Sequence, residues 1–136
     1  MSIKVELKDN IDLIKYGDRV TEILDGGIDN AIQNIFSNAV SDAPLGKTGK
    51  LKTTARKNYE NLSGSVTFPV HYAPYVEFGT GGLVDVPEGL EDYAIQFIGK
   101  GIRQVNLPPR PFLMPNYFRE SRQLLNNLTA AIDKLK

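Results

Sequence analysis

The sequence YAPYVEFGT, Tyr72–Thr80, is the most informative stretch of this chain of 136 residues. It places two tyrosines and a phenylalanine around one carboxylate, Glu77. It also contains a proline and a glycine, residues that often mark the ends of a helix. Pro74 suits the first turn of a short helix, and Gly79 suits the residue just past its end. We therefore expect a helical turn at 74–78, or else a strand in which Pro74 lies at a sheet edge.

Upstream, residues 18–41 repeat apolar side chains at steps of three and four, which is the spacing of one helix face. The apolar residues of this pattern are Val20, Ile23, Leu24, Ile28, Ala31, Ile35 and Ala39. Gly26 and Gly27 interrupt it, and because glycine disfavours helix interiors we expect a kink or a close backbone contact there. Pro44 then ends the predicted helix.

Three shorter segments have the composition of strands. Residues 3–7 alternate apolar and polar side chains, which predicts a short strand or a flexible arm. Residues 53–59 and 65–70 are strand-compatible, and the sequence Asn-Leu-Ser-Gly at 61–64 between them is typical of a turn. These segments predict a β-hairpin.

The last third of the chain predicts two helices separated by an extended segment. Residues 87–98 resemble a short helix with acidic residues in its first turns, and the prolines at 108, 109 and 111 favour an extended backbone. A final helix is expected at 115–135. Its apolar face would carry Phe118, Leu125, Leu128, Ile132 and Leu135. This face would pack against the first helix and the hairpin, or would form a seam with another subunit.

Together these elements predict an α+β fold in which a small antiparallel sheet is covered by the N- and C-terminal helices. The chain is expected to form a single domain, 1–136, with a loop insertion at about 81–109. Within it, residues 81–86 and 99–109 are expected to be mobile or to become ordered on assembly. Neither an apolar run long enough to span a membrane nor a signal peptide is recognisable, so we expect a cytoplasmic product.

Composition excludes several classes of site. The chain has no cysteine, a single histidine and a formal net charge of zero. Disulfides, thiolate nucleophiles and histidine-cluster metal sites are therefore excluded, and bulk charge predicts no general attraction to nucleic acid or membrane. Charge is nevertheless uneven along the chain, with a basic stretch at 47–57 and an acidic stretch at 85–92. These are either solvated surfaces or complementary edges that join neighbouring copies.

No catalytic, cofactor or metal site is predicted. Gly46-Lys47-Thr48 matches only the end of a phosphate-binding loop, because Ser41 replaces its first glycine. Gly79-Thr80-Gly81 begins a dinucleotide-binding pattern, but Val84 replaces the third glycine. Burial of Glu77 would make it resemble a general acid, but no second carboxylate stands at a defined spacing. We expect this carboxylate to be paired with backbone amides or with a lysine or arginine.

Three short elements follow one another between the two long helices. They are Thr48-Gly49-Lys50-Leu51 after Pro44, Tyr72–Thr80, and Arg110-Pro111-Phe112-Leu113. In this order the chain resembles the tail-completion (neck) protein family of long-tailed, double-stranded-DNA bacteriophages, the gene-product-ten-like tail components. It departs from that family in the long insertion between the second and third elements, and in Lys47 where the family usually has an aspartate.

The resemblance implies a structural virion protein of a tailed bacteriophage or prophage, not an enzyme, that completes the tail or joins head to tail. Copies would form a homo-oligomeric ring around the DNA passage, although an isolated subunit can be a monomer. Partners would be other neck, connector, tail-tube or terminator proteins, with only non-specific contact to passing double-stranded DNA, no membrane and no cofactor. Such a protein is assembled in the bacterial host cytoplasm and ends in the virion. The alternatives are a minor capsid or tail-end component, or a small nucleic-acid-binding protein.

The resemblance also nominates candidate assembly or motif residues. They are Lys50, Leu51, Tyr72, Tyr75, Glu77, Phe78, Gly79, Thr80, Arg110, Pro111 and Phe112. The aromatic residues among them are rigid apolar anchors that face either the core or a partner. Lys50 or Arg110 is expected to pair with Glu77 or with a neighbour's acid. Contact of the basic stretch at 47–57 with phosphates in the wall of a DNA channel, without reading sequence, is a further alternative to a solvated surface or a contact between copies.

Overall fold

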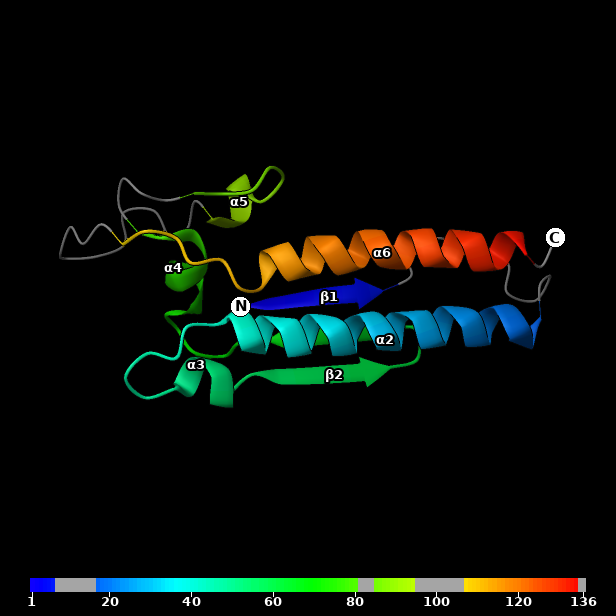
Figure 1. Cartoon of the computed structure of the whole chain (residues 1–136), viewed down its shortest axis with the longest axis horizontal. Coiled ribbons are helices and arrows are strands. Elements are labelled where there is room, and N and C mark those ends of the chain that lie inside the picture. The colour runs from blue at the N-terminus through cyan, green and yellow to red at the C-terminus, as the bar shows by residue number, and fades with distance from the viewer. Residues whose placement is uncertain (7–16, 81–84, 95–106, 135–136) are drawn as a thin grey trace.

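The architecture was obtained as a computed structural model, which describes residues 1–6, 17–80, 85–94 and 107–134. Three strands and five helices follow one another along the described parts (Figure 1). The elements are β1 (Ser2–Glu6), α2 (Asp18–Asp42), α3 (Lys50–Thr53), β2 (Arg56–Glu60), β3 (Ser63–Thr67), α4 (Ala73–Phe78), α5 (Glu91–Ala94) and α6 (Met114–Asp133). A small antiparallel sheet with helices packed on it confirms the predicted α+β class.

The sheet has β3 in its middle, paired antiparallel with β1 on one side and β2 on the other. Side chains alternate between its two faces because successive residues of a strand point in opposite directions. The face towards α2 carries Ile3, Val5, Lys57, Tyr59, Gly64 and Val66. The opposite face carries Ser2, Lys4, Glu6, Arg56, Asn58, Glu60, Ser63, Ser65 and Thr67. Among the described elements, helices therefore pack on one face of the sheet, and the side chains of its other face are polar.

The long helix α2 lies lengthwise along the sheet, and α6 runs antiparallel beside α2 (Figure 1). Gly64 of β3 permits this packing, because a Cβ atom at that position would lie 2.4 Å from Cγ1 of Ile32. Gly27 has a similar role between the two helices, since its Cβ atom would lie 3.0 Å from Leu128 and 3.1 Å from Leu124. Gly27 thus marks a close contact with α6, and α2 continues through both glycines without a break.

Two sequence expectations about the hairpin need correction. The turn between β2 and β3 consists of Asn61 and Leu62, both with positive φ, and Gly64 lies inside β3. Glycine is needed there for the approach of α2, although its residue type suggested a turn. The hairpin's first strand also begins at Arg56, later than expected, because the preceding residues form the short helix α3.

The expected apolar face of α6 is wrong at two positions. Phe118 is 38% exposed and Leu125 is 67% exposed. The side chains that reach α2 at Gly27 are Leu124 and Leu128, so the contact stripe is rotated relative to the predicted one. Leu135, another predicted member of that face, and the predicted helical residues 95–98 lie outside the described part of the chain.

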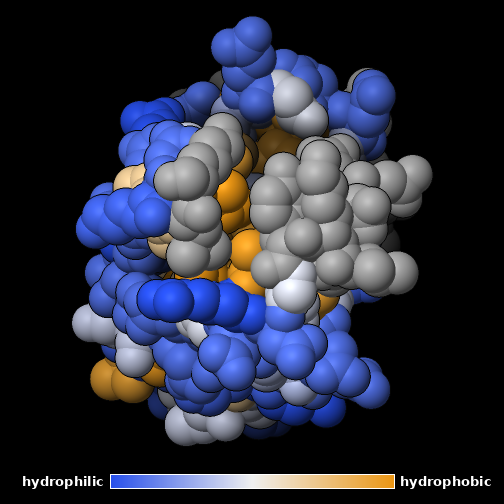
Figure 2. Space-filling model, turned by 90° about the vertical axis from the view of Figure 1, so that its right-hand side faces the viewer, coloured by the Kyte–Doolittle hydropathy of each residue, from blue (hydrophilic) through white to orange (hydrophobic). Residues whose placement is uncertain are grey.

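The interior is one continuous apolar cluster that joins the sheet, the middle of α2 and the segment entering α6. Its most buried members include Ile32, Ile35, Val66, Phe68, Phe78, Phe112 and Leu113. At the end of the molecule where α2 begins and α6 ends, the surface is mostly hydrophilic, with apolar side chains visible in a central hollow (Figure 2). Among the described helices, none is long and apolar enough to cross a membrane.

Candidate functional site

The stretch YAPYVEFGT forms α4 and its C-terminal cap, as expected. Pro74 lies in the first turn, where a missing N–H costs nothing, and the N–H of Gly79 donates to the carbonyl oxygen of Tyr75 at 3.0 Å. The φ of Gly79 is 81°, a torsion angle that side chains other than glycine rarely adopt. The proline and the glycine therefore fix where this helix begins and ends.

Glu77 of α4 is 2% exposed and binds the start of α6 through backbone amides. Its Oε2 accepts hydrogen bonds from the N–H groups of Phe112 at 2.9 Å and Leu113 at 3.0 Å, and its Oε1 accepts from Met114 at 2.9 Å. Met114 is the first residue of α6, Leu113 is its N-cap and Phe112 precedes the cap, so these N–H groups have no intrahelical acceptor. The helix dipole also favours a negative charge at this end of α6. The carboxylate thus caps α6 from a distant part of the sequence.

Sequence reasoning allowed Glu77 two kinds of partner, backbone amides or a cation. The structure has the amides, and neither Lys50 nor Arg110 pairs with this carboxylate. Both of these cations are exposed. Three charge-assisted hydrogen bonds are the kind of compensation that allows a carboxylate to be buried without a cation.

The segment before α6 also pairs with α4 and its cap. The N–H of Arg110 donates to the carbonyl oxygen of Val76 at 2.8 Å, and the N–H of Thr80 donates to that of Leu107 at 3.0 Å. The N–H of Leu107 in turn donates to the Thr80 hydroxyl at 2.9 Å. The two sequence elements that carried the resemblance, separated by about thirty residues, are therefore interlocked into one unit, hereafter the α4–α6 junction.

Aromatic packing completes the α4–α6 junction. The rings of Phe68 and Phe112 meet edge to face with centroids 4.8 Å apart, and those of Phe78 and Tyr93 do so at 6.2 Å. Phe78 and Phe112 are at most 1% exposed, and Leu113 is fully buried. Of the two orientations left open, these three side chains take the core one, whereas Tyr75 is half-buried.

A second buried polar side chain, Asn116, was not found by sequence reasoning. Its amide donates to Asp42 at the end of α2 at 2.9 Å and to the carbonyl oxygen of Phe112 at 2.7 Å, and Arg119 donates to its oxygen. The only sequence signal is a polar residue next to the prolines that open a helix, which is too common to single it out. Asn116 joins both long helices at the junction.

The remaining candidate residues lie around this unit. Leu51 anchors α3 in the core at 3% exposure, whereas Lys50 beside it is exposed. Pro111 contributes to a small, mostly apolar pocket of about 170 Å³ that also contains Phe78, Asp85 and Phe118. Tyr72 is half-buried and meets the exposed His71 edge to face at 5.4 Å. In the described parts of the chain, no three His, Asp or Glu side chains gather as a metal site would require.

Comparison with known proteins gives no relative: no protein-family profile, no curated protein and no solved structure matches this chain. The α4–α6 junction is the strongest geometric feature available, because it combines a buried carboxylate, a capped helix start and paired backbone segments.

Proposed function

We propose that this protein is a structural virion component of a tailed bacteriophage or prophage that completes the tail or joins head to tail. Copies form a ring around the DNA passage and contact other neck, connector or tail proteins. The resemblance to tail-completion proteins motivates the proposal, and the α4–α6 junction is the observation that supports it.

The support comes from how the resemblance elements relate in space. Tyr72–Thr80 and Arg110–Leu113 are far apart in the sequence, yet Glu77 accepts two hydrogen bonds from the second element and a third from Met114 directly after it. A capped, rigid junction also suits an assembly subunit, because a preorganised surface loses less conformational entropy on binding.

The test is a stop codon early in this gene in the parent phage, followed by electron microscopy of the lysate. A joining role predicts DNA-filled heads beside separate, unattached tails. A synonymous change of the same codon is the matched control for effects on neighbouring genes, and plasmid-borne wild-type protein should restore attached particles. Normal infectious particles would contradict the proposal. Malformed heads or tails of abnormal length would favour a minor capsid or tail-end role instead.

A further inference from the structure

Four cations project from one flank of the molecule around α3 and the start of β2. This basic lobe consists of Lys47, Lys50, Lys52 and Arg56. Leu51, buried in the core, holds α3 in place, so the charges are carried by a fixed element. The ammonium of Lys52 donates to the carbonyl oxygen of Ser41, and no member of the lobe forms an ion pair with any described residue.

Four exposed carboxylates occupy the opposite flank around α5. This acidic lobe consists of Asp85, Glu88, Glu91 and Asp92. It is attached to the junction by the N–H of Asp85, which donates to the carbonyl oxygen of Phe78 at 2.9 Å, and by the ring contact between Phe78 and Tyr93. Within the described residues, its carboxylates also lack ion-pair partners.

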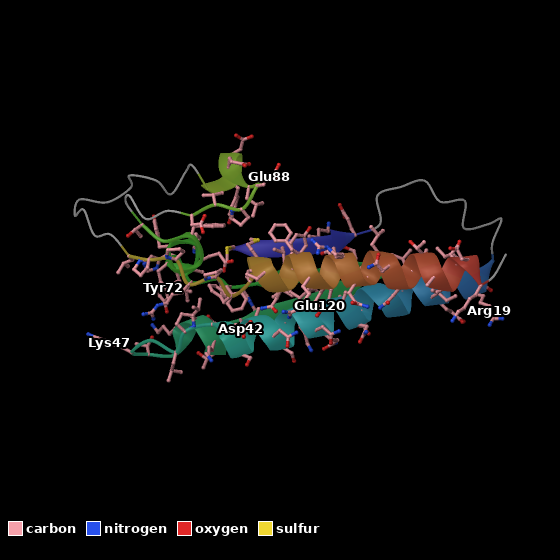
Figure 3. The ribbon with its side chains drawn as sticks, turned by 45° about the horizontal axis from the view of Figure 1, so that its top comes forward. Arg19, Asp42, Lys47, Tyr72, Glu88 and Glu120 are labelled. Carbon is pink, nitrogen blue, oxygen red and sulfur yellow. The ribbon has the colours of Figure 1, made fainter. Side chains whose placement is uncertain are left out.

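The two lobes lie at the same end of the molecule but on opposite sides of it. Figure 1 shows α5 above α4 and α3 below it, and Figure 3 shows Glu88 and Lys47 on opposite sides of the ribbon. The lobes therefore do not meet within one copy, although their charges are equal in number and opposite in sign. Pairing between them requires two copies.

We propose that the basic lobe of one copy docks against the acidic lobe of the next. This inference rests on the proposed ring and names its subunit contact. Because different surfaces of the two copies meet, the contact is heterologous, and a heterologous contact repeated around an axis closes into a ring. Charge complementarity also sets the direction of the ring, since two basic lobes repel each other.

An exposed apolar side chain favours a second copy of the chain, and not DNA, as the partner of the basic lobe. Leu45, 67% exposed, lies two residues before Lys47 in the loop that precedes α3. An apolar side chain surrounded by charges is typical of a protein interface with an apolar centre and a polar rim, whereas a phosphate backbone needs only the cations. The zero net charge of the chain also favours a protein partner of matching acidity.

The direct test is zero-length carbodiimide cross-linking of the full chain at low salt, using a mixture of isotopically light and heavy copies. This reagent joins lysine to a carboxylate only where the two are in contact, so even a transient ring contact is captured. We expect light–heavy cross-links between Lys47, Lys50 or Lys52 and Glu88, Glu91 or Asp92. High salt should suppress them because exposed ion pairs are screened.

Charge reversal makes the test specific. The variant Lys47→Glu/Lys50→Glu/Lys52→Glu and the variant Glu88→Lys/Glu91→Lys/Asp92→Lys should each lose self-association by about tenfold or more, since like charges then oppose each other. An equimolar mixture of the two should regain it, because each lobe again meets its opposite. The matched control reverses Arg19, Arg122 and Lys134, which lie outside both lobes, and Arg19 lies far from Lys47 (Figure 3). This control should associate like wild type.

Absence of inter-lobe cross-links in wild type, or wild-type association of both reversed variants, overturns the proposal. Salt-sensitive binding of duplex DNA that is lost in the lysine-reversed variant, without cross-links, assigns the basic lobe to phosphates and also overturns it. These outcomes are separable from failure of the proposed function. Unattached tails in the stop-codon phage, combined with no inter-lobe contact, would keep the neck role and reject this ring contact.

Discussion

Among single residues, Glu77 is expected to have the largest effect on stability. Glu77→Ala leaves the buried N–H groups of Phe112, Leu113 and Met114 without their acceptor. Each unsatisfied buried donor costs about 1–3 kcal/mol, so we expect the free energy of unfolding to fall by about 4 kcal/mol. Glu77→Gln keeps one carbonyl oxygen and should lose about half as much. Urea denaturation followed by circular dichroism measures both values.

The matched control for Glu77 is an exposed glutamate of the same chain. Glu88→Ala removes a carboxylate of the acidic lobe and should change the free energy of unfolding by less than about 0.5 kcal/mol. Equal losses in Glu77→Ala and Glu88→Ala would mean that the amide contacts of Glu77 do not stabilise the fold.

The protein is expected to lose stability at alkaline pH because of Tyr59. Burial, together with its hydrogen bond to Asp25, raises the pKa of Tyr59 from 10.0 to about 12. Between these values the unfolded chain releases the phenol proton while the folded chain keeps it, so rising pH favours unfolding. We expect urea denaturation at about pH 9 and about pH 11 to show a larger loss for wild type than for Tyr59→Phe. Equal losses in the two proteins would contradict this coupling.

The site was only partly predictable at this scale. The sequence indicated that Glu77 is buried and paired, because apolar and aromatic residues surround it. Which amides it binds depends on the path of the chain before α6, and no local pattern encodes that path. Asn116 was missed for the same reason, since its partner Asp42 lies at the end of another helix.

Between elements, the contact of α2 with the sheet depends on Gly64. Gly64→Ala would place a Cβ atom 2.4 Å from Cγ1 of Ile32, so the helix and the strand must move apart. We expect a loss of about 2–3 kcal/mol in the free energy of unfolding. Ile32→Ala removes the clashing atoms, and the double variant should therefore lose less than the sum of the two single variants. Strict additivity would contradict direct contact at this position.

The adjacent glycines of α2 provide a matched pair. Gly26 is exposed, and an added Cβ atom there would meet no other part of the protein within 4 Å. Gly26→Ala should therefore stabilise the protein by about 0.5–1 kcal/mol, because alanine has the higher helix propensity. Gly27→Ala gains the same propensity, but its Cβ atom presses on Leu124 and Leu128. We expect Gly27→Ala to be less stable than Gly26→Ala in thermal denaturation. The reverse order would contradict the close packing of α6 on α2.

Elements were predicted correctly where the sequence signal lies within the element itself. The long apolar repeat of α2 and the proline–glycine punctuation of α4 identified both helices, because both signals act within one element. The buried face of α6 was placed incorrectly, because an apolar spacing such as Phe118–Leu125 does not say which neighbour a helix meets. Gly64 was assigned to a turn because glycine is common in turns. The reason for a glycine at this position is the close approach of Ile32, which belongs to another element.

For the molecule as a whole, the buried contacts are unevenly distributed. The core joins α2, the sheet and the α4–α6 junction, whereas the charged side chains of the two lobes are largely exposed. Regions with few buried apolar contacts open at low free energy without global unfolding. The buried framework is therefore expected to stay closed while the peripheral helix α5 opens locally.

Hydrogen exchange measured by mass spectrometry tests this arrangement. In the free chain, amides of α2 and β3 should exchange most slowly, because exchange there requires global unfolding, and those of α5 should exchange fastest among the described helices. If copies assemble through the two lobes as proposed, protection should increase around α3 and α5 and stay unchanged in the middle of α2. If α5 were as protected as α2 in the free chain, the uneven distribution of stability would be wrong. If protection on assembly appeared instead beside the groove of about 520 Å³ between β1 and α6, the subunit contact would lie there and not between the lobes.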